Sequence, residues 1–127
     1  MRRTVVVLSS HRSENEEMSN LLASHDLVVE SIYTIDHLES WLEKQDSLAV
    51  FIDTDSIALD NKTIRQLNRK FPSVNLLLFS AKRIHPDLKE AIGQYVYACI
   101  SKPIDPEEVS YWLKCIQDDD PKTVKPD

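Results

Sequence analysis

The sequence predicts an α/β fold in which one parallel five-stranded sheet is covered by helices on both faces. Five short apolar runs recur along the chain, and each is followed by a segment with apolar residues at helical spacing. The length of 127 residues suits a single domain. Because crossovers between parallel strands are right-handed, the doubly wound, flavodoxin-like topology with strand order 2-1-3-4-5 is the most economical arrangement of five strands and five helices.

The first strand is predicted over residues 4–8, where a continuous apolar run indicates a strand buried on both faces. Residues 13–16 (Ser-Glu-Asn-Glu) have the form of a capping box, which predicts the start of a helix at this point. The apolar stripe of that helix consists of Met18, Leu21 and Leu22.

The second strand is predicted over residues 27–33, and Thr34 follows it as the N-cap of a second helix. The apolar face of that helix carries Ile35, Leu38, Trp41 and Leu42. The third strand is predicted over residues 48–52, and Asp60 caps a third helix that ends before Pro72.

The fourth strand is predicted over residues 74–79, with Ser80 at its end. A helix then starts near Pro86 and closes near Gly93, the only glycine in the chain. The fifth strand covers residues 95–100, and Asp105 with Pro106 opens the last helix, whose apolar positions are Val109, Trp112, Leu113 and Ile116. Residues 1–117 form the predicted domain, and residues 118–127 are expected to be a disordered tail or the remnant of a linker.

Composition excludes several classes of function. The net charge is −6 and the 15 lysines and arginines are scattered, which argues against direct binding of nucleic acid. The longest apolar runs are far shorter than a membrane span, and the N-terminus lacks the long apolar stretch of a signal peptide. We therefore expect a cytoplasmic protein without contact to a membrane.

The cysteines and histidines form no motif in the sequence. Cys99 and Cys115 fall in apolar segments and are expected to be core thiols. The four histidines, His11, His25, His37 and His85, show no pair at metal-ligand spacing on one helical face.

Polar residues follow the predicted strands at the edge where parallel strands end together. Ser9 and Ser10 follow the first strand, Asp53 and Asp55 the third, Ser80 the fourth and Lys102 the fifth. A carboxylate, a hydroxyl and an ammonium that converge can form and hold an acyl phosphate. In that chemistry Asp53 attacks a phosphoryl group, Ser80 donates a hydrogen bond to it and Lys102 neutralises its charge.

Over residues 3–117 the chain resembles the receiver domain of two-component response regulators. The matching stretches are residues 50–53 (Val-Phe-Ile-Asp), 59–61 (Leu-Asp-Asn), 77–81 (Leu-Leu-Phe-Ser-Ala) and 100–104 (Ile-Ser-Lys-Pro-Ile). The resemblance implies that Asp53 stands at the phosphoacceptor position, that Ser80 and Lys102 contact the phosphoryl group, and that the Lys102–Pro103 bond is cis. It also implies a signalling module without catalytic residues, whose partner is a histidine kinase or a downstream regulator.

The first departure from the family pattern concerns the metal site, and the proline and glycine usual after the phosphoacceptor are also replaced, by Ile57 and Asn61. The family holds Mg²⁺ with an acidic pair after the first strand, where this sequence has Ser9 and Ser10. Only Asp53 and the backbone carbonyl of Asp55 remain as ligands, so we expect no metal or weak Mg²⁺, no other cofactor, and weak or absent Mg²⁺-dependent phosphorylation. The neighbouring His11 or Arg12 is a candidate to supply the missing positive charge, and a solvated loop is the simpler interpretation.

The second departure concerns the aromatic switch residue that the family places three positions before the lysine. That position is Cys99 here, and Tyr97, expected on the same side of the strand, is the candidate substitute. By resemblance, a partner or a second copy of the chain would bind the face formed by the fourth helix, fifth strand and fifth helix. The aromatic residues of these elements are Tyr95, Tyr97, Tyr111 and Trp112.

Three alternatives stay open. The chain could be an ordinary response regulator that readily accepts phosphate on Asp53. It could be a small phosphatase, because Asp53 and Asp55 form an Asp-x-Asp motif in which the first residue is a nucleophile and the second a general acid/base. It could bind flavin through Ser9, Ser10 and Ser13, although that loop lacks the glycine that lets a backbone approach phosphate.

Overall fold

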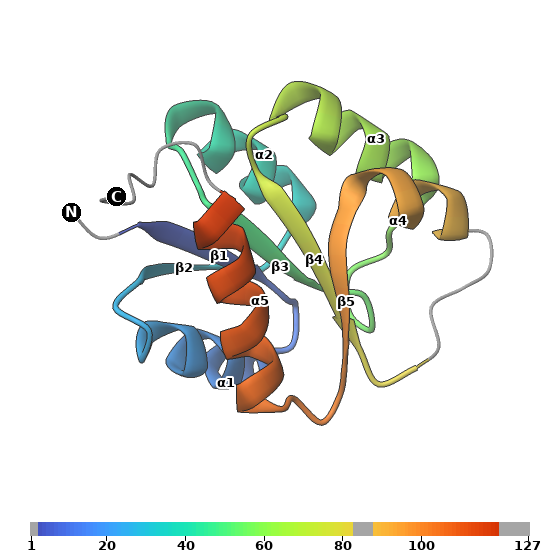
Figure 1. Cartoon of the computed structure of the whole chain (residues 1–127). Helices are drawn as coiled ribbons and strands as arrows, with labels where there is room; N and C mark the ends of the chain where they lie inside the picture. Colours follow the sequence, from blue (N-terminus) through green and yellow to red (C-terminus); the bar gives the residue numbers. More distant parts are fainter. Residues whose placement is uncertain (1–2, 83–87, 120–127) are drawn as a thin grey trace.

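The sheet has the predicted architecture. In the computed structural model, which describes residues 3–82 and 88–119, five parallel strands lie in the order β2-β1-β3-β4-β5. The order and the parallel pairing confirm the predicted doubly wound, flavodoxin-like topology (Figure 1). The strands are β1 (Thr4–Leu8), β2 (Val28–Ile32), β3 (Ala49–Asp53), β4 (Asn75–Ser80) and β5 (Val96–Ser101).

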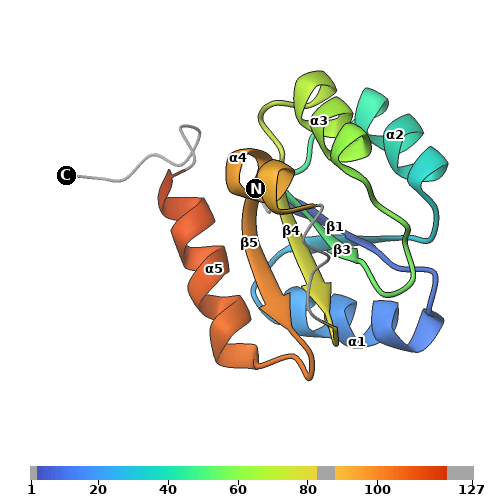
Figure 2. The ribbon, with the colours of Figure 1, turned by 90° about the vertical axis from the view of Figure 1, so that its right-hand side faces the viewer.

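Helices cover both faces of this sheet. Helices α1 and α5 lie on one face, and α2, α3 and α4 lie on the other (Figures 1 and 2). Their bounds are α1 (Arg12–Ala23), α2 (Ile35–Lys44), α3 (Asn61–Lys70), α4 (Lys89–Tyr95) and α5 (Pro106–Asp119). None of the helices in the described ranges is long and apolar enough to cross a membrane.

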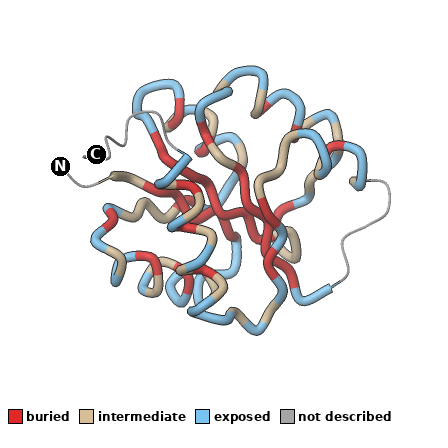
Figure 3. The backbone as a smooth tube through the Cα atoms, viewed as in Figure 1, coloured by how far each residue is buried: buried red, intermediate tan, exposed pale blue. Residues whose placement is uncertain are grey.

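The strands are apolar throughout because they are buried from both sides. In β1, Val5 and Val7 pack toward α1 and α5, while Val6 and Leu8 pack toward α2 and α3. Figure 3 shows the consequence: the buried segments coincide with the sheet, and exposed segments lie on the outer sides of the helices.

Three helix starts agree with the sequence. The side chain of Thr34 accepts a hydrogen bond from the backbone of His37, and that of Asp60 accepts one from Thr63. The Asp105 carboxylate accepts a 2.9 Å hydrogen bond from the backbone of Glu107, next to the first turn of α5.

The predicted capping box of α1 is wrong. The helix begins at Arg12, one residue before Ser13, and His11 is the N-cap residue without a side-chain cap bond. The hydroxyl of Ser9 instead accepts a hydrogen bond from the backbone of His11 at 3.2 Å, so the turn into the helix is fixed from the end of β1.

The boundary between α4 and β5 lies later than predicted. Gly93 is inside the helix and has no positive φ, so it does not end it. The helix runs to Tyr95 because Ala91, Ile92 and Tyr95 pack against the core on the α3 side, and β5 starts at Val96. The predicted helix start at Pro86 lies outside the described residues.

The prediction that both cysteines are core residues is wrong. Cys99 is exposed and Cys115 is half-buried. Because β5 is an edge strand, only one of its faces is well covered: Ala98 and Ile100 point into the α1 and α5 side of the core, and Cys99 between them points away from it.

Candidate functional site

The polar residues predicted at the strand ends do meet at one edge of the sheet. Asp53 is the last residue of β3 and is fully buried, while Ser9 follows β1 and is also buried. Ser80 ends β4, and Lys102 directly follows β5. The Lys102–Pro103 bond is cis, as the resemblance implied.

Both carboxylate oxygens of Asp53 are held by donors. Oδ2 accepts a hydrogen bond from the Ser9 hydroxyl at 2.8 Å. Oδ1 accepts one from the Lys102 ammonium at 2.8 Å and one from the backbone of Asp55 at 3.1 Å. Burial by itself would raise the pKa of Asp53, but these hydrogen bonds, Lys102 first among them, outweigh it and lower the pKa.

Lys102 lies at the centre of three carboxylates. Besides Asp53, its Nζ atom donates to Glu14 at 2.5 Å and to Asp55 at 3.0 Å. Burial opposes the charged ammonium, yet the three acidic partners raise the pKa of Lys102 well above its ordinary value. Lys102 is therefore a fixed positive charge, and its ammonium also lies 5.3 Å from the centre of the Phe79 ring.

Glu14 was missed by the sequence analysis. It lies in the first turn of α1, three residues after His11, so the two side chains share one side of the helix start. The signal was available: the first turn of a helix that follows a buried strand lies beside the end of that strand. The predicted capping box starts the helix one residue later, at Ser13, and therefore did not indicate that Glu14 lies beside the end of β1.

Ser80 contacts Asp55 rather than Asp53. Its hydroxyl donates to Asp55 Oδ1 at 2.6 Å, and the backbone of Ala81 donates to Oδ2 at 2.8 Å. Burial raises the pKa of Asp55, but the bonds from Ala81, Ser80 and Lys102 outweigh it and bring the pKa to about 2. Asp55 is thus a firmly ionised anchor for Ser80 and Lys102.

The serines after β1 are engaged within the protein. Ser9 contacts Asp53, and the Ser10 hydroxyl donates to the backbone carbonyl of Tyr33 at 3.0 Å. A second residue missed in the sequence, Ser56, accepts from the backbone of Ser10 at 2.9 Å and lies 3.3 Å from the Ser9 hydroxyl. Ser13 lies within α1. These hydroxyls are not gathered into a phosphate cradle, which weighs against the flavin alternative.

The donor set does not fit the Mg²⁺ site that the fold implies. Magnesium is held chiefly by carboxylates and water. Here the two positions after β1 offer hydroxyls that are committed to Asp53 and Tyr33, and the Asp53 carboxylate is shared with Lys102. Neither of the two residues that follow β1 supplies a carboxylate.

His11 lies beside the pocket. Its Nδ1 atom is 3.5 Å from Glu14 Oε2 and 3.9 Å from Asp53 Oδ2, and more than half of its side chain is exposed. The positive charge that actually contacts Asp53 comes from Lys102. Arg12 is exposed at the first position of α1.

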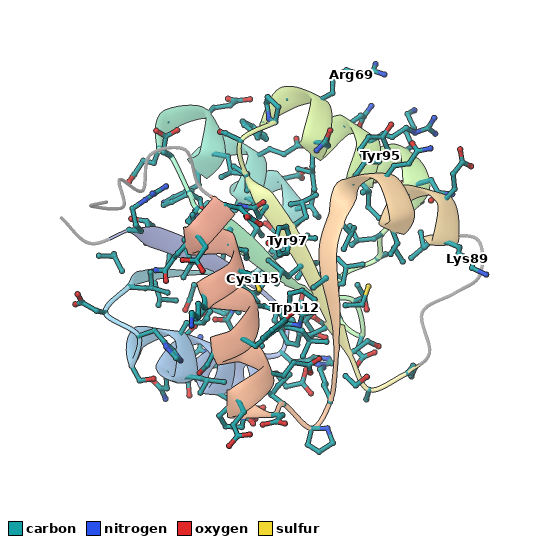
Figure 4. The ribbon with its side chains drawn as sticks, viewed as in Figure 1. Arg69, Lys89, Tyr95, Tyr97, Trp112 and Cys115 are labelled. Carbon is teal, nitrogen blue, oxygen red and sulfur yellow. The ribbon has the colours of Figure 1, made fainter. Side chains whose placement is uncertain are left out.

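The aromatic residues near β5 are mostly packed inside the protein. A register shift between β4 and β5 places Tyr97 against Trp112 of α5, with ring centres 6.0 Å apart (Figure 4). Tyr97 therefore packs with the α1 and α5 side of the core while Cys99 points away from it, so the expectation that the two share one side of the strand is wrong. The Tyr97 hydroxyl donates to Asp119 at 2.8 Å.

Tyr111 differs from these residues. It is 60% exposed, and its ring lies edge-on to Trp112 at 5.0 Å. Tyr95 is half-buried against the α3 side of the core. Of the four aromatic residues predicted for a binding face, Tyr111 is the one that offers a large exposed surface.

A hollow of about 150 Å³ opens next to Lys102. Acidic side chains of α1 line one side, and apolar side chains line the other. The lining residues are Glu14, Glu17, Met18, Phe79, Lys102, Pro103 and Ile104. Small solutes can therefore reach the ammonium and Glu14 from solvent.

Comparison with solved structures identifies the class of fold. A receiver domain protein from Methanospirillum hungatei superposes with a TM-score of 0.84 at 12% identity, covering 98% of this chain and 100% of that one. The signal receiver domain of an HD domain-containing protein from Pseudomonas fluorescens gives 0.81 at 15% identity, with coverage of 93% and 96%. The chain has the fold of response-regulator receiver domains.

A third similar structure is a response regulator from Thermotoga maritima, with a TM-score of 0.76, 21% identity and coverage of 91% of this chain and 98% of that one. At the level of sequence, no family model and no curated protein matches this chain. The likeness therefore lies in the fold, and the function must be argued from the residues of the site.

Proposed function

We propose that the chain is an atypical receiver domain of two-component or phosphorelay signalling that regulates a partner protein, with weak or absent Mg²⁺-dependent phosphorylation of Asp53. One observation carries the proposal: Ser9 donates to Asp53 at the place where the family has a metal-binding carboxylate. The receiver fold and the positions of Asp53, Ser80 and Lys102 support the class of module.

The chemistry of phosphoryl transfer explains why Ser9 matters. Transfer to a carboxylate builds negative charge between donor and acceptor, and Mg²⁺ normally offsets that charge. Without the acidic pair, Lys102 is the only cation that contacts Asp53 among the described residues. Its single charge is already shared among three carboxylates, which leaves little to stabilise an incoming phosphoryl group.

The direct test is incubation with acetyl phosphate and Mg²⁺, followed by intact-mass measurement. We expect little or no gain of one phosphoryl mass in the wild-type chain. Ready, stoichiometric phosphorylation that disappears in Asp53→Asn would instead establish the ordinary phosphoaccepting regulator.

A gain-of-function variant makes the test two-sided. The double change Ser9→Asp with Ser10→Asp rebuilds the acidic pair and should raise Mg²⁺-dependent labelling well above that of the wild type. Ser10→Asp combined with Ser13→Asp adds the same charge but leaves Ser9 in place, and it should not. Equal labelling of both variants would show that general negative charge, rather than the acidic pair, controls the reaction.

The proposed output is protein binding on the α4-β5-α5 face by a histidine kinase or downstream regulator, or by a second copy of the chain. Tyr111, exposed on α5, supports an interface there because exposed aromatic residues often anchor one. The proposal includes a cytoplasmic location, no direct contact with nucleic acid and no enzymatic activity of its own.

The Asp-x-Asp phosphatase is the alternative of another class, and the state of Asp55 weighs against it. A general acid must carry a proton near neutral pH. The pKa of Asp55 is about 2, because Ala81, Ser80 and Lys102 hold its ionised form. Hydrolysis of p-nitrophenyl phosphate that is lost in Asp55→Ala would revive this alternative.

A further inference from the structure

Three metal-ligating side chains from two elements converge at the mouth of the pocket. One ligand atom each from His11, Glu14 and Asp53 lies within 4.8 Å of the other two. His11 and Glu14 come from the start of α1, three residues apart, and Asp53 comes from the end of β3. No histidine pair marks this group in the sequence, because only one histidine takes part.

The spacing of these atoms suits a small tetrahedral ion. Ligand atoms about 2.0–2.1 Å from a tetrahedral zinc ion are separated from one another by about 3.3 Å. His11 Nδ1 lies 3.5 Å from Glu14 Oε2 and 3.9 Å from Asp53 Oδ2, close to this spacing. The group as a whole spans up to 4.8 Å, so closing the site requires movement of the His11 and Glu14 side chains. His11 is more than half exposed and Glu14 is one-third exposed, which gives both side chains room to move.

The pocket also carries an excess of negative charge, which favours the binding of a cation. Three carboxylates face one ammonium, which leaves a formal charge of −2 on these four side chains. Lys102 and Ser9 already offset the buried charge of Asp53, so the excess of negative charge comes from Asp55 and the partly exposed Glu14. One divalent ion would bring the group to neutrality.

Lys102 does not block this position. It contacts Oδ1 of Asp53, whereas the oxygen nearest to His11 is Oδ2. Its bond to Glu14 uses Oε2, the same oxygen that lies 3.5 Å from His11 Nδ1, so the ammonium and an ion would share that carboxylate. The ammonium does lower the affinity of the site, because it repels a second cation at short range.

The nature of the donors selects the metal. An imidazole nitrogen suits zinc and its transition-metal neighbours, whereas Mg²⁺ takes six oxygen ligands and gives up water reluctantly. Three protein ligands would leave a fourth tetrahedral position for water.

We propose that His11, Glu14 and Asp53 form a Zn²⁺-binding site that takes the place of the lost Mg²⁺ site. The inference goes beyond the proposed signalling function and does not rest on it, because it depends only on donor atoms, distances and charge. Zinc titration and acetyl phosphate labelling are separate measurements, so the failure of either is recognisable.

The experiment is calorimetric titration of the metal-free chain with zinc chloride and, separately, with magnesium chloride. We expect one Zn²⁺ per chain and binding of Mg²⁺ at least tenfold weaker. His11→Gln and Glu14→Gln should each weaken Zn²⁺ binding at least tenfold, and Lys102→Met should strengthen it. His37→Gln on α2 and Glu17→Gln on α1 are the matched controls, since both residues lie outside the cluster and are exposed.

His11 and Glu14 are partly exposed, so their variants should fold, and circular dichroism checks that they do. Cobalt provides a second readout, because Co²⁺ bound by one imidazole and two carboxylates in a tetrahedral site gives visible absorption bands that His11→Gln should abolish. The proposal is overturned if the wild type takes up no Zn²⁺, if Mg²⁺ binds as tightly, or if His11→Gln and His37→Gln lose affinity equally.

Discussion

Ser9 is the residue that most changes the expected chemistry of this pocket. It is fully buried, and its hydroxyl joins Asp53, the backbone of His11 and Ser56 in one small network. A hydroxyl is neutral, so Ser9 can donate a hydrogen bond to Asp53 without adding negative charge to the pocket, as a carboxylate at this position would. This part of the pocket is therefore held together by the protein's own hydrogen bonds.

Ser9→Ala should therefore destabilise the protein. The change removes a hydrogen bond to a buried carboxylate and leaves the backbone of His11 without its acceptor, at a cost of about 1–3 kcal/mol in the free energy of unfolding. Urea unfolding at pH 7 measures the loss. Ser10→Ala is the control: Ser10 is exposed, and its removal should change stability by less than about 0.5 kcal/mol. Equal losses would contradict the role given to Ser9.

Asp55 makes the stability of the protein depend on acid. Its pKa is about 2 in the folded chain and 3.8 ordinarily, so the folded state binds fewer protons than the unfolded state between these values. Its contribution is fully present above about pH 4 and is lost as the pH falls toward 2. Asp53, whose pKa is also lowered, acts in the same direction.

The measurement is urea unfolding at pH 5, 4 and 3. The wild type should lose stability over this series, and Asp55→Asn should lose less, because the variant lacks a carboxylate that must be protonated. An unchanged dependence on pH in Asp55→Asn would show that other groups control acid unfolding.

At the scale of the element, helix α4 offers a simple gain of stability. Gly93 lies inside the helix with no positive φ, it is exposed, and a Cβ atom built on it would meet no atom within 4 Å. Gly93→Ala should stabilise the protein by about 0.5–1 kcal/mol, because alanine loses less conformational freedom in a helix than glycine does. The melting temperature should rise by roughly 2–6 °C.

Gln94→Ala, an exposed neighbour in the same helix, is the control and should have a much smaller effect. A fall in the melting temperature of Gly93→Ala would mean that the glycine has a role that its surroundings do not reveal.

Prediction from sequence succeeded where an element carries its own signal. The continuous apolar run of β1 marks a doubly covered strand, and Thr34, Asp60 and Asp105 mark helix starts with bonds that stay within a few residues. It failed where contacts distant in the chain decide. Gly93 predicts the end of a helix, but α4 continues to Tyr95 because Tyr95 packs against the core. Ser13 predicts a helix N-cap, but the hydrogen bond from the backbone of His11 to Ser9 sets the turn that starts α1 one residue earlier.

At the scale of the whole molecule, the same distinction holds for the site. Parallel topology brings strand ends together, so Asp53, Ser80 and Lys102 could be placed at one edge from sequence alone. The hydrogen-bond partner of each side chain could not be predicted in this way. The bond of Ser80 to Asp55 and that of Lys102 to Glu14 depend on side-chain directions, and the second joins residues 88 positions apart.

The exposed face of α5 makes a prediction about assembly. If a second copy binds the α4-β5-α5 face, Tyr111→Asp should shift a concentration-dependent dimer toward the monomer in light scattering, since Tyr111 is the most exposed of its large apolar side chains. Tyr33→Asp is the matched control, because Tyr33 is 39% exposed and follows β2 at the opposite edge of the sheet. A wild-type monomer at all concentrations, or equal behaviour of the two variants, would rule out this dimer.

The ion pair between Lys102 and Glu14 also bears on how the chain is made. Synthesis proceeds from the N-terminus, so Glu14, Asp53 and Asp55 leave the ribosome well before Lys102 does. Until β5 and Lys102 have been added, the three carboxylates lie close together without the ammonium that neutralises part of their charge. Their repulsion then opposes folding at the C-terminal edge of the sheet. Lys102, which follows the last strand, thus supplies the counter-charge, and a nascent chain that stops short of residue 102 should remain open at the edge where Lys102 joins the three carboxylates.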